Sequence, residues 1–276
     1  MSTGTATADI LAAYDLEEVG PNRYRGPNAR STHGVVFGGQ LLGQALLAAG
    51  AGHSDLAVKT LHAVFARAAS FDAPIDIEVE PVHAGRTFAS STVTLRQGDR
   101  ICVRAQVLLS ADEPDCIRHA DEAPGHQPPA DDDPTPEWQV QIVDDVDISD
   151  PGLTGPAELD VWTRFVGAPD DPAVNQALLA FATDGFLIGT AMRPHEGVGQ
   201  AQAHVTLSTG VISHTITFHE PVAAGAWNLL VHRSPYAGHG RSYGTADVFS
   251  ADGALVASFV QDAMIRPRDP NAGGKL

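Results

Sequence analysis

The segment Gly240-Arg241-Ser242-Tyr243-Gly244 matches the G-x-S-x-G pattern, in which a serine hydroxyl on a sharp turn attacks a carbonyl carbon. Such a turn must follow a strand and open a helix. Here Ala246–Phe249 has the pattern of a strand, and it leads into the hairpin turn Asp252-Gly253. The sequence therefore does not favour Ser242 as a nucleophile.

The sequence contains twelve histidines, a residue type that commonly binds metal ions. No H-x-x-x-H helix is present, and the one close pair, Cys116 with His119, has no second pair at ligand spacing. We therefore predict neither a metal nor another cofactor.

Four other side chains could do acid–base or hydrogen-bonding chemistry, but residue type alone favours structural roles. Asp184 directly precedes the helix-like run Gly185–Met192, where an aspartate commonly accepts a backbone N–H bond as an N-cap. Gln261 falls in the last predicted strand, where an isolated glutamine usually faces solvent. His62 and His214 stand in apolar strand contexts typical of structural histidines.

The composition is that of a soluble globular protein with one large domain or two smaller ones: 276 residues, 43% hydrophobic and 18% charged. With a net charge of −17, the chain as a whole lacks the positive charge that binding to nucleic acid or anionic lipid requires. Two cysteines, Cys102 and Cys116, are too few for a disulfide framework, and no segment has the apolar length of a signal peptide or membrane span. We predict a cytoplasmic protein.

A proline-rich acidic stretch divides the chain at residues 111–138. It cannot bury enough apolar area to form a core, so we interpret it as a solvated linker between an N-terminal unit, residues 1–110, and a C-terminal unit, residues 139–276.

The same pattern occurs on both sides of this linker. Gly85–Gln106 aligns without a gap with Gly240–Gln261, which superposes Gln106 on Gln261. Both segments have the pattern strand, glycine turn, strand, and the turn glycines are Gly98 and Gly253. The repeat predicts two similar units in one chain.

Each unit also contains a helix ahead of its strands. Residues 41–49 are apolar almost all round, with Gln40 and Gln44 as the main polar exceptions, so this helix should be buried against a sheet. In the second half, Val174–Phe181 and Gly185–Met192 have helical spacing. We predict an α+β fold in which a long antiparallel sheet wraps round a central helix, twice.

Several separated motifs resemble the acyl-CoA thioesterase II family, in the family's order. In the first half these are Phe37–Ala45 and Leu61–Phe65. In the second half they are Val161–Arg164, Phe181–Asp184, Ser213-His214 with Phe218-His219, and Asp252-Gly253 through Val260–Asp262. The resemblance covers nearly the whole chain outside the linker. It implies a double hotdog fold and hydrolysis of acyl-CoA to a free fatty acid and CoA.

In that family an aspartate, a hydroxyl residue and a glutamine position the attacking water. The resemblance places Asp184 and Gln261 at the aspartate and glutamine positions, but Val211 at the hydroxyl position. Valine cannot form a hydrogen bond through its side chain. Thr209 and Ser213 lie at even spacing from Val211 and should share its strand face, so either could supply the hydroxyl.

Acyl-CoA is the expected ligand, and its phosphates require local positive charge. Arg241 and Arg86 are at equivalent positions of the two aligned repeats, and Gly240 offers a backbone N–H beside Arg241. For Arg241 a phosphate contact and a structural ion pair stay open, and for Arg86 we favour the ion pair. The resemblance adds His62 and Gly39 to the substrate site.

Two alternatives stay open on the same scaffold. A non-catalytic acyl-CoA binding protein is favoured by Val211, and an enoyl-CoA hydratase would need a local aspartate–histidine pair that neither half contains. Since double hotdog units commonly associate in this family, we predict a homo-oligomer.

Overall fold

The structure is a computed structural model that describes residues 2–29, 34–130 and 133–268. Its strands are β1 (Ser2–Ala6), β2 (Glu17–Gly20), β3 (Arg23–Gly26), β4 (Ala57–Phe65), β5 (Ile75–Ala84), β6 (Phe88–Gln97), β7 (Arg100–Ser110), β8 (Glu137–Ile142), β9 (Glu158–Phe165), β10 (Leu207–Phe218), β11 (Asn228–Gly238), β12 (Arg241–Ser250) and β13 (Leu255–Pro267). The α-helices are α1 (Thr7–Ala13), α2 (Gly38–Gly50), α3 (Pro172–Thr183) and α4 (Leu187–Met192), with short 3-10 turns at Val143–Asp145 and Gln200–Gln202.

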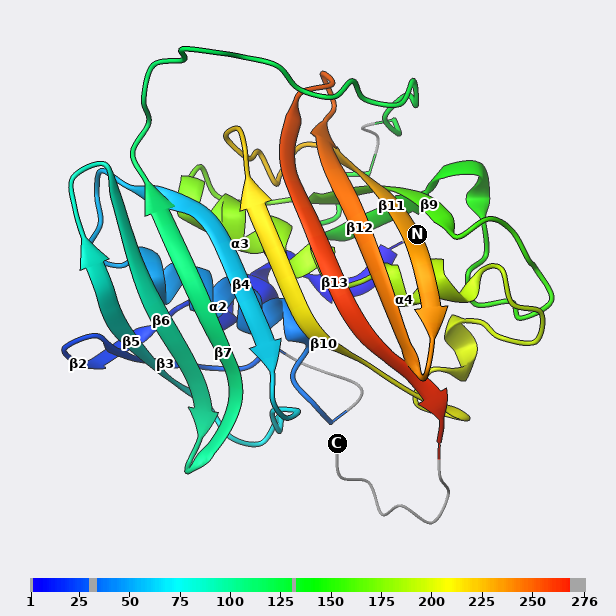
Figure 1. Cartoon of the computed structure of the whole chain (residues 1–276), viewed down its shortest axis with the longest axis horizontal. Helices are drawn as coiled ribbons and strands as arrows, with labels where there is room; N and C mark the ends of the chain where they lie inside the picture. Colours follow the sequence, from blue (N-terminus) through cyan, green and yellow to red (C-terminus); the bar gives the residue numbers. More distant parts are fainter. Residues whose placement is uncertain (1, 30–33, 131–132, 269–276) are drawn as a thin grey trace.

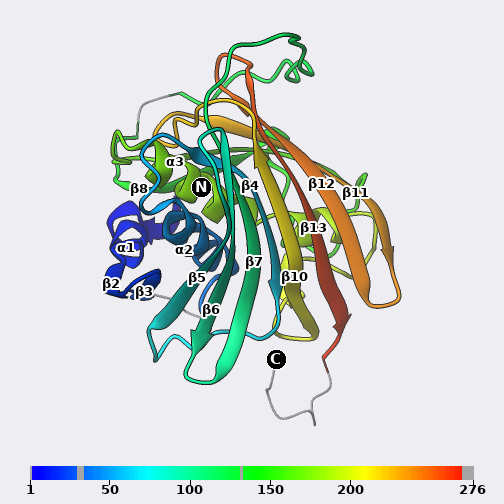
Figure 2. The same ribbon diagram turned by 60° about the vertical axis from the view of Figure 1, so that its left-hand side comes forward.

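All these strands form one antiparallel sheet in the order β1-β8-β9-β11-β12-β13-β10-β4-β7-β6-β5-β3-β2. Outward from the central β10–β4 pair, β10-β13-β12-β11 on one side mirrors β4-β7-β6-β5 on the other. The sheet curves round α2 and α3, which lie on its inner side (Figures 1 and 2). The predicted arrangement, a long antiparallel sheet round a central helix in each half, is confirmed.

Helix α2 is buried almost all round because it lies between the first-half sheet and α3. Glycines allow this close packing: a Cβ on Gly39 would lie 2.3 Å from the carbonyl oxygen of Phe181, and one on Gly43 would lie 2.2 Å from the Tyr14 hydroxyl. The buried amide of Gln44 donates to the carbonyl oxygens of Ala13 and Pro27, each at 2.9 Å. The amide nitrogen of this predicted polar exception is thus bonded inside the core, whereas its side-chain oxygen has no hydrogen-bond partner among the described residues.

Glycines also make the repeated hairpin turns, since Gly98 and Gly253 have φ of +58° and +90°. The ungapped alignment of the two repeats is wrong beyond these turns. In β7 the extra bulge residue is Cys102, and in β13 it is Val256, so Val107 and not Gln106 corresponds to Gln261. A one-residue slip moves a side chain to the other face of a sheet.

Gln106 accordingly lies exposed on the outer face, where its amide donates to Thr92 at 3.0 Å. Gln261 is buried on the inner face and pairs with His214. The equivalent inner pair of the first half is Leu61 with Val107, both buried and apolar.

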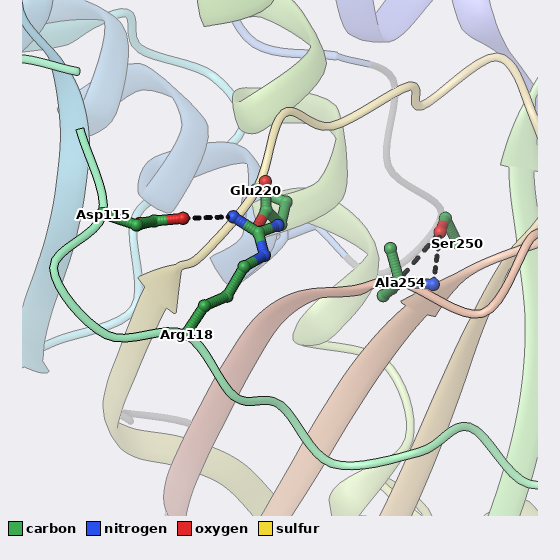
Figure 3. Close-up of polar contacts among 5 residues, drawn as sticks. All are labelled: Asp115, Arg118, Glu220, Ser250 and Ala254. Atoms are coloured by element: carbon green, nitrogen blue, oxygen red, sulfur yellow. Dashed lines mark hydrogen bonds and ion pairs between the residues drawn. The ribbon is translucent and has the colours of Figure 1, made fainter. Parts of the chain in front are cut away.

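The acidic stretch contains no strand up to β8 in its described part and arches over the second half (Figure 1). Arg118 bridges Asp115 and Glu220 at 2.8 and 2.7 Å (Figure 3). Farther along, His126 contacts the Asp160 carboxylate at 2.7 Å. The described part of the stretch is largely exposed, and side chains tether it to the second half.

Segments from both predicted units pack together at one edge of the sheet. Trp138, predicted to end the linker, is a core residue of β8, and β1 from the N-terminus pairs with β8 at the sheet edge. Among the described residues, no helix is long and apolar enough to cross a membrane.

Candidate active site

Asp184 is the C-cap residue of α3. The expectation that it caps the following helix is wrong: α4 begins three residues later, its N-cap is Phe186, and no side chain caps it. Asp171 is the aspartate that acts as an N-cap, accepting backbone N–H bonds from Ala173 and Val174 at the start of α3. The Asp184 carboxyl group is thus free to face other elements.

Three elements meet at the Asp184 carboxyl group. The backbone N–H of Gly39, in the first turn of α2, donates to Oδ2 at 3.0 Å. The Gln261 amide, on β13, donates to Oδ1 at 3.2 Å. A Cβ on Gly38 would lie 2.7 Å from Oδ2, so a side chain there would displace the Asp184 carboxyl group. The positive end of the α2 dipole therefore faces a buried acid.

Aromatic rings pack together from the segments that flank this acid and the start of α2. Phe181 packs against Phe37 and Trp138, with ring centroids 4.8 and 5.3 Å apart, and Trp138 also packs against Phe186. Burial raises the pKa of Asp184 from 3.8 to about 7, and the Gly39 N–H bond opposes this shift. A carboxyl group that titrates near neutrality suits a general base. Phe37 and Phe186 lie in this aromatic cluster, and Phe65 lies beside Gly38.

A second hydrogen-bonded chain leads away from Gln261. Its Nε2 lies 3.3 Å from Nδ1 of His214, whose Nε2 lies 3.1 Å from the Thr183 hydroxyl. The hydroxyl in turn donates to the Ala180 carbonyl oxygen at 2.8 Å. Burial lowers the pKa of His214 to about 3, so its ring is neutral. Sequence reasoning missed Thr183, although it directly precedes Asp184 in a quoted motif.

The expectation that Ser213 shares a face with Val211 is wrong. Strand β10 has a bulge between these two residues, so Val211 pairs with Ala263 on the inner face whereas Ser213 pairs with Asp262 on the outer one. The Ser213 hydroxyl donates to the Asp262 carboxylate at 2.9 Å.

Thr209 does share the inner face with Val211 and is buried. It pairs with Ile265, four residues along β13 from Gln261, which is roughly 13 Å at strand spacing. The structure therefore does not bring Thr209 into the hydrogen-bonded cluster around Asp184.

His62 lies exposed on the outer face of β4, where its Nδ1 is 2.5 Å from the Thr215 hydroxyl of β10. Its neighbours in β4, Leu61 and Ala63, point inward and are buried. The sheet thus separates His62 from Asp184.

Gly240 and Arg241 lie at a cavity at the far end of α4. The cavity has a volume of about 270 Å³ and is lined by apolar side chains, including Met192, Leu207 and Ile265, with Arg241 and Arg266 beside them. Gly240, at φ +71°, forms the β11–β12 turn. Within the described ranges, neither Arg241 nor Arg86 forms an ion pair, and the Arg241 guanidinium donates only to the Gly240 carbonyl oxygen.

The cavity and the acid lie on the same inner face of the sheet. Ile265 follows Gln261 by four residues on β13, and α4 begins beside Asp184 and ends at the cavity with Met192. In the part of the chain that the structure describes, no three His, Cys, Asp or Glu side chains are grouped to bind a metal.

A sheet wrapped round a central helix twice within one chain defines a double hotdog protein. A solved acyl-CoA thioesterase II from Mycobacterium marinum has the same fold, with a TM-score of 0.79 and 28% identity over 96% of this chain and 99% of that one. Residues 27–110 and 119–265 match the family models for the acyl-CoA thioesterase N-terminal and C-terminal domains. The chain belongs to the acyl-CoA thioesterase II family, which confirms the resemblance.

Two further relatives are similar over nearly their whole length. Acyl-CoA thioesterase 2 of Haemophilus influenzae is 29% identical, with 94% of this chain and 97% of that protein covered. Acyl-coenzyme A thioesterase 8 of Mus musculus is 26% identical, with 97% and 92% covered.

Proposed function

We propose that this protein hydrolyses acyl-CoA thioesters to a free fatty acid and CoA, with water as the nucleophile and Asp184 as the general base. The observation that carries the proposal is the buried Asp184 carboxyl group, held by the Gly39 N–H and the Gln261 amide. The names of the relatives support the substrate class.

A thioester carbonyl carbon is electrophilic enough for direct attack by water. Asp184 accepts a proton from the water as the new C–O bond forms, and the positive end of the α2 dipole stabilises the oxyanion. Collapse of the tetrahedral intermediate breaks the C–S bond, and the CoA sulfur leaves with the proton that Asp184 has taken. We include neither His62 nor Ser213, because both face the opposite side of the sheet.

The test of this reaction is release of free CoA thiol from short, medium and long acyl-CoAs. Asp184→Asn should lower kcat at least roughly 100-fold, the scale of general-base catalysis. The matched control is Asp262→Asn, which alters a neighbour of Gln261 on the outer face and should retain activity.

A second candidate function is a non-catalytic acyl-CoA binding protein, because Val211 supplies no hydroxyl group to a catalytic site. Under that function the wild-type protein releases no thiol from any chain length but binds acyl-CoA in calorimetry, and Asp184→Asn binds equally well. Thiol release that Asp184→Asn abolishes would exclude it.

We further propose that the cavity beside Arg241 holds part of the substrate, with Arg241 and the Gly240 backbone contacting a CoA phosphate. Arg241→Ala should raise KM about threefold to tenfold and leave kcat unchanged, since an exposed charge-assisted contact is worth about 1 kcal/mol. The matched control is Arg86→Ala, which removes an exposed arginine of the first half far from the cavity residues in sequence. Equal KM values for the two variants would exclude this role.

The predicted homo-oligomer and cytoplasmic location remain proposals. Both cysteines are free thiols, which supports a reducing compartment. Light scattering of the purified protein measures the oligomeric state, and a monomeric mass would contradict the prediction.

A further inference from the structure

We propose that His214 and Thr183 are positioning residues that fix the orientation of the Gln261 amide, so that Oε1 of Gln261 accepts a hydrogen bond from the attacking water. This inference rests on the proposed hydrolysis. It concerns residues that touch neither water nor substrate in the mechanism above.

The argument starts at the Thr183 hydroxyl, which has a single proton. That proton goes to the Ala180 carbonyl oxygen at 2.8 Å, because a carbonyl can only accept. In the hydrogen bond of 3.1 Å between the Thr183 hydroxyl and Nε2 of His214, the ring must therefore be the donor. Nε2 of His214 therefore carries a hydrogen.

A neutral imidazole carries one ring hydrogen, so Nδ1 of His214 is an acceptor. The ring is fully buried, stacked on Phe259 with centroids 5.5 Å apart, and burial holds it neutral. The group 3.3 Å from Nδ1 must be a donor, and that group is the Nε2 amide nitrogen of Gln261.

Both amide hydrogens of Gln261 are thereby used, one on Nδ1 of His214 and one on Oδ1 of Asp184. A flipped amide would place Oε1 against a carboxylate oxygen and an imidazole lone pair, which is repulsive on both sides. Oε1 is left as the acceptor of the side chain. It is buried without a hydrogen-bond partner in the described structure, and a buried acceptor of this kind calls for a polar ligand.

A water can donate one hydrogen to Oε1 of Gln261 and the other to the Asp184 carboxylate, which aims its oxygen lone pair at the thioester carbon. This arrangement of Thr183, His214 and Gln261 compensates for Val211, which offers no hydroxyl group from β10. It exists in one half only, because Leu61 and Val107 occupy the equivalent positions of His214 and Gln261 in the first half.

Thr183→Val removes the acceptor for Nε2–H at nearly constant volume, and His214→Phe removes the acceptor for the amide while keeping the aromatic stack. Each should lower kcat about tenfold or more with KM unchanged, and Thr183→Ser should recover most of the rate. Circular dichroism and thermal melts establish that each variant is folded. Wild-type kcat in folded Thr183→Val, or equal losses in Thr183→Val and Thr183→Ser, would overturn the inference.

The tautomer of His214 gives a readout that does not depend on activity. Long-range ¹H–¹⁵N correlation spectra of the full-length protein should show hydrogen on Nε2, and His214→Phe assigns the signal. Hydrogen on Nδ1 would overturn the inference even in an active enzyme. Failure of the proposed hydrolysis is distinct, since the wild-type protein would then release no thiol from any acyl-CoA.

Discussion

At the scale of single residues, Asp184 combines two opposing influences. Burial disfavours its charged form, whereas the Gly39 N–H at the α2 N-terminus favours it. Burial is the larger influence, so the pKa lies about 7 rather than 3.8. The acid can thus take up and release a proton near neutral pH.

The pH dependence of the rate follows from this pKa. The base form of Asp184 is the carboxylate, so kcat/KM should rise with pH and level off above about 7, with a roughly tenfold loss per pH unit well below it. Thiol release measured from pH 5 to 9 with one acyl-CoA checks this. A profile that is already level at pH 5 would show that the reactive base has an ordinary carboxyl pKa.

The same pKa predicts a pH-dependent stability. Because the folded pKa is raised, the folded state holds a proton that the unfolded chain has lost between about pH 4 and 7. This contribution to stability is present below pH 4 and lost as pH rises through 7, by about 4 kcal/mol at 1.4 kcal/mol per unit.

Asp184→Asn removes this titration. Its melting temperature relative to wild type should therefore increase from pH 4 to about pH 7 and then level off, as measured by thermal melts in a series of buffers. A difference that is constant over this range would contradict the raised pKa.

At the scale of elements, the contact between α2 and α3 positions the acid. The first turn of α2 touches the last turn of α3 because Gly38 and Gly39 have no side chains. The same contact brings the Gly39 N–H within reach of Asp184. Helix packing and site geometry therefore depend on the same glycines.

Gly39→Ala should destabilise the fold by about 1–3 kcal/mol, the usual cost of overpacking, because its Cβ meets the rigid backbone of Phe181. The control is Gly50→Ala at the other end of α2, where a Cβ meets nothing within 4 Å. That change should be neutral or stabilise by up to about 1 kcal/mol through helix propensity. Urea unfolding measures both, and equal effects would show that α2 and α3 are not tightly packed at Gly39.

Strand bulges are the other decisive feature at this scale. The bulge in β10 turns Ser213 outward and His214 inward. The hairpin turn before β13 is one residue longer than the turn before β7, since Ser250 bonds to Ala254 whereas Gln97 pairs with Arg100, and this difference places Gln106 and Gln261 on opposite faces. Even spacing along the sequence predicts a shared face only in a regular strand, so sequence reasoning placed these side chains incorrectly.

At the scale of the whole molecule, two similar halves share one sheet but differ in chemistry. The linker crosses the second half, and Ala123 packs on the small outer cluster of Trp162, Leu229 and Phe249. The exposed Arg118 ion pairs add little stability, as is usual for surface pairs. Apolar packing of Ala123 thus contributes to the attachment of the linker, beside the contact of His126 with Asp160.

Ala123→Asp should release the linker, because it puts a charge against this cluster, and should increase limited proteolysis within residues 111–136 severalfold. The control is Ala120→Asp, an exposed position of the same linker. Equal cleavage rates of the two variants, followed by mass spectrometry, would contradict attachment through Ala123.

The sequence by itself determined the two repeats, the buried helix, the hairpin turns and the membership of the family, because these depend on local periodicity, glycine and matching motifs. It also indicated Asp184 and Gln261 as a pair through those motifs. Only the tertiary structure decided what surrounds them: Gly39 and Gln261 lie 145 and 77 residues from Asp184 along the chain. Their contacts, the burial that raises the pKa, and the faces chosen by the bulges arise from packing between distant segments, which no local pattern encodes.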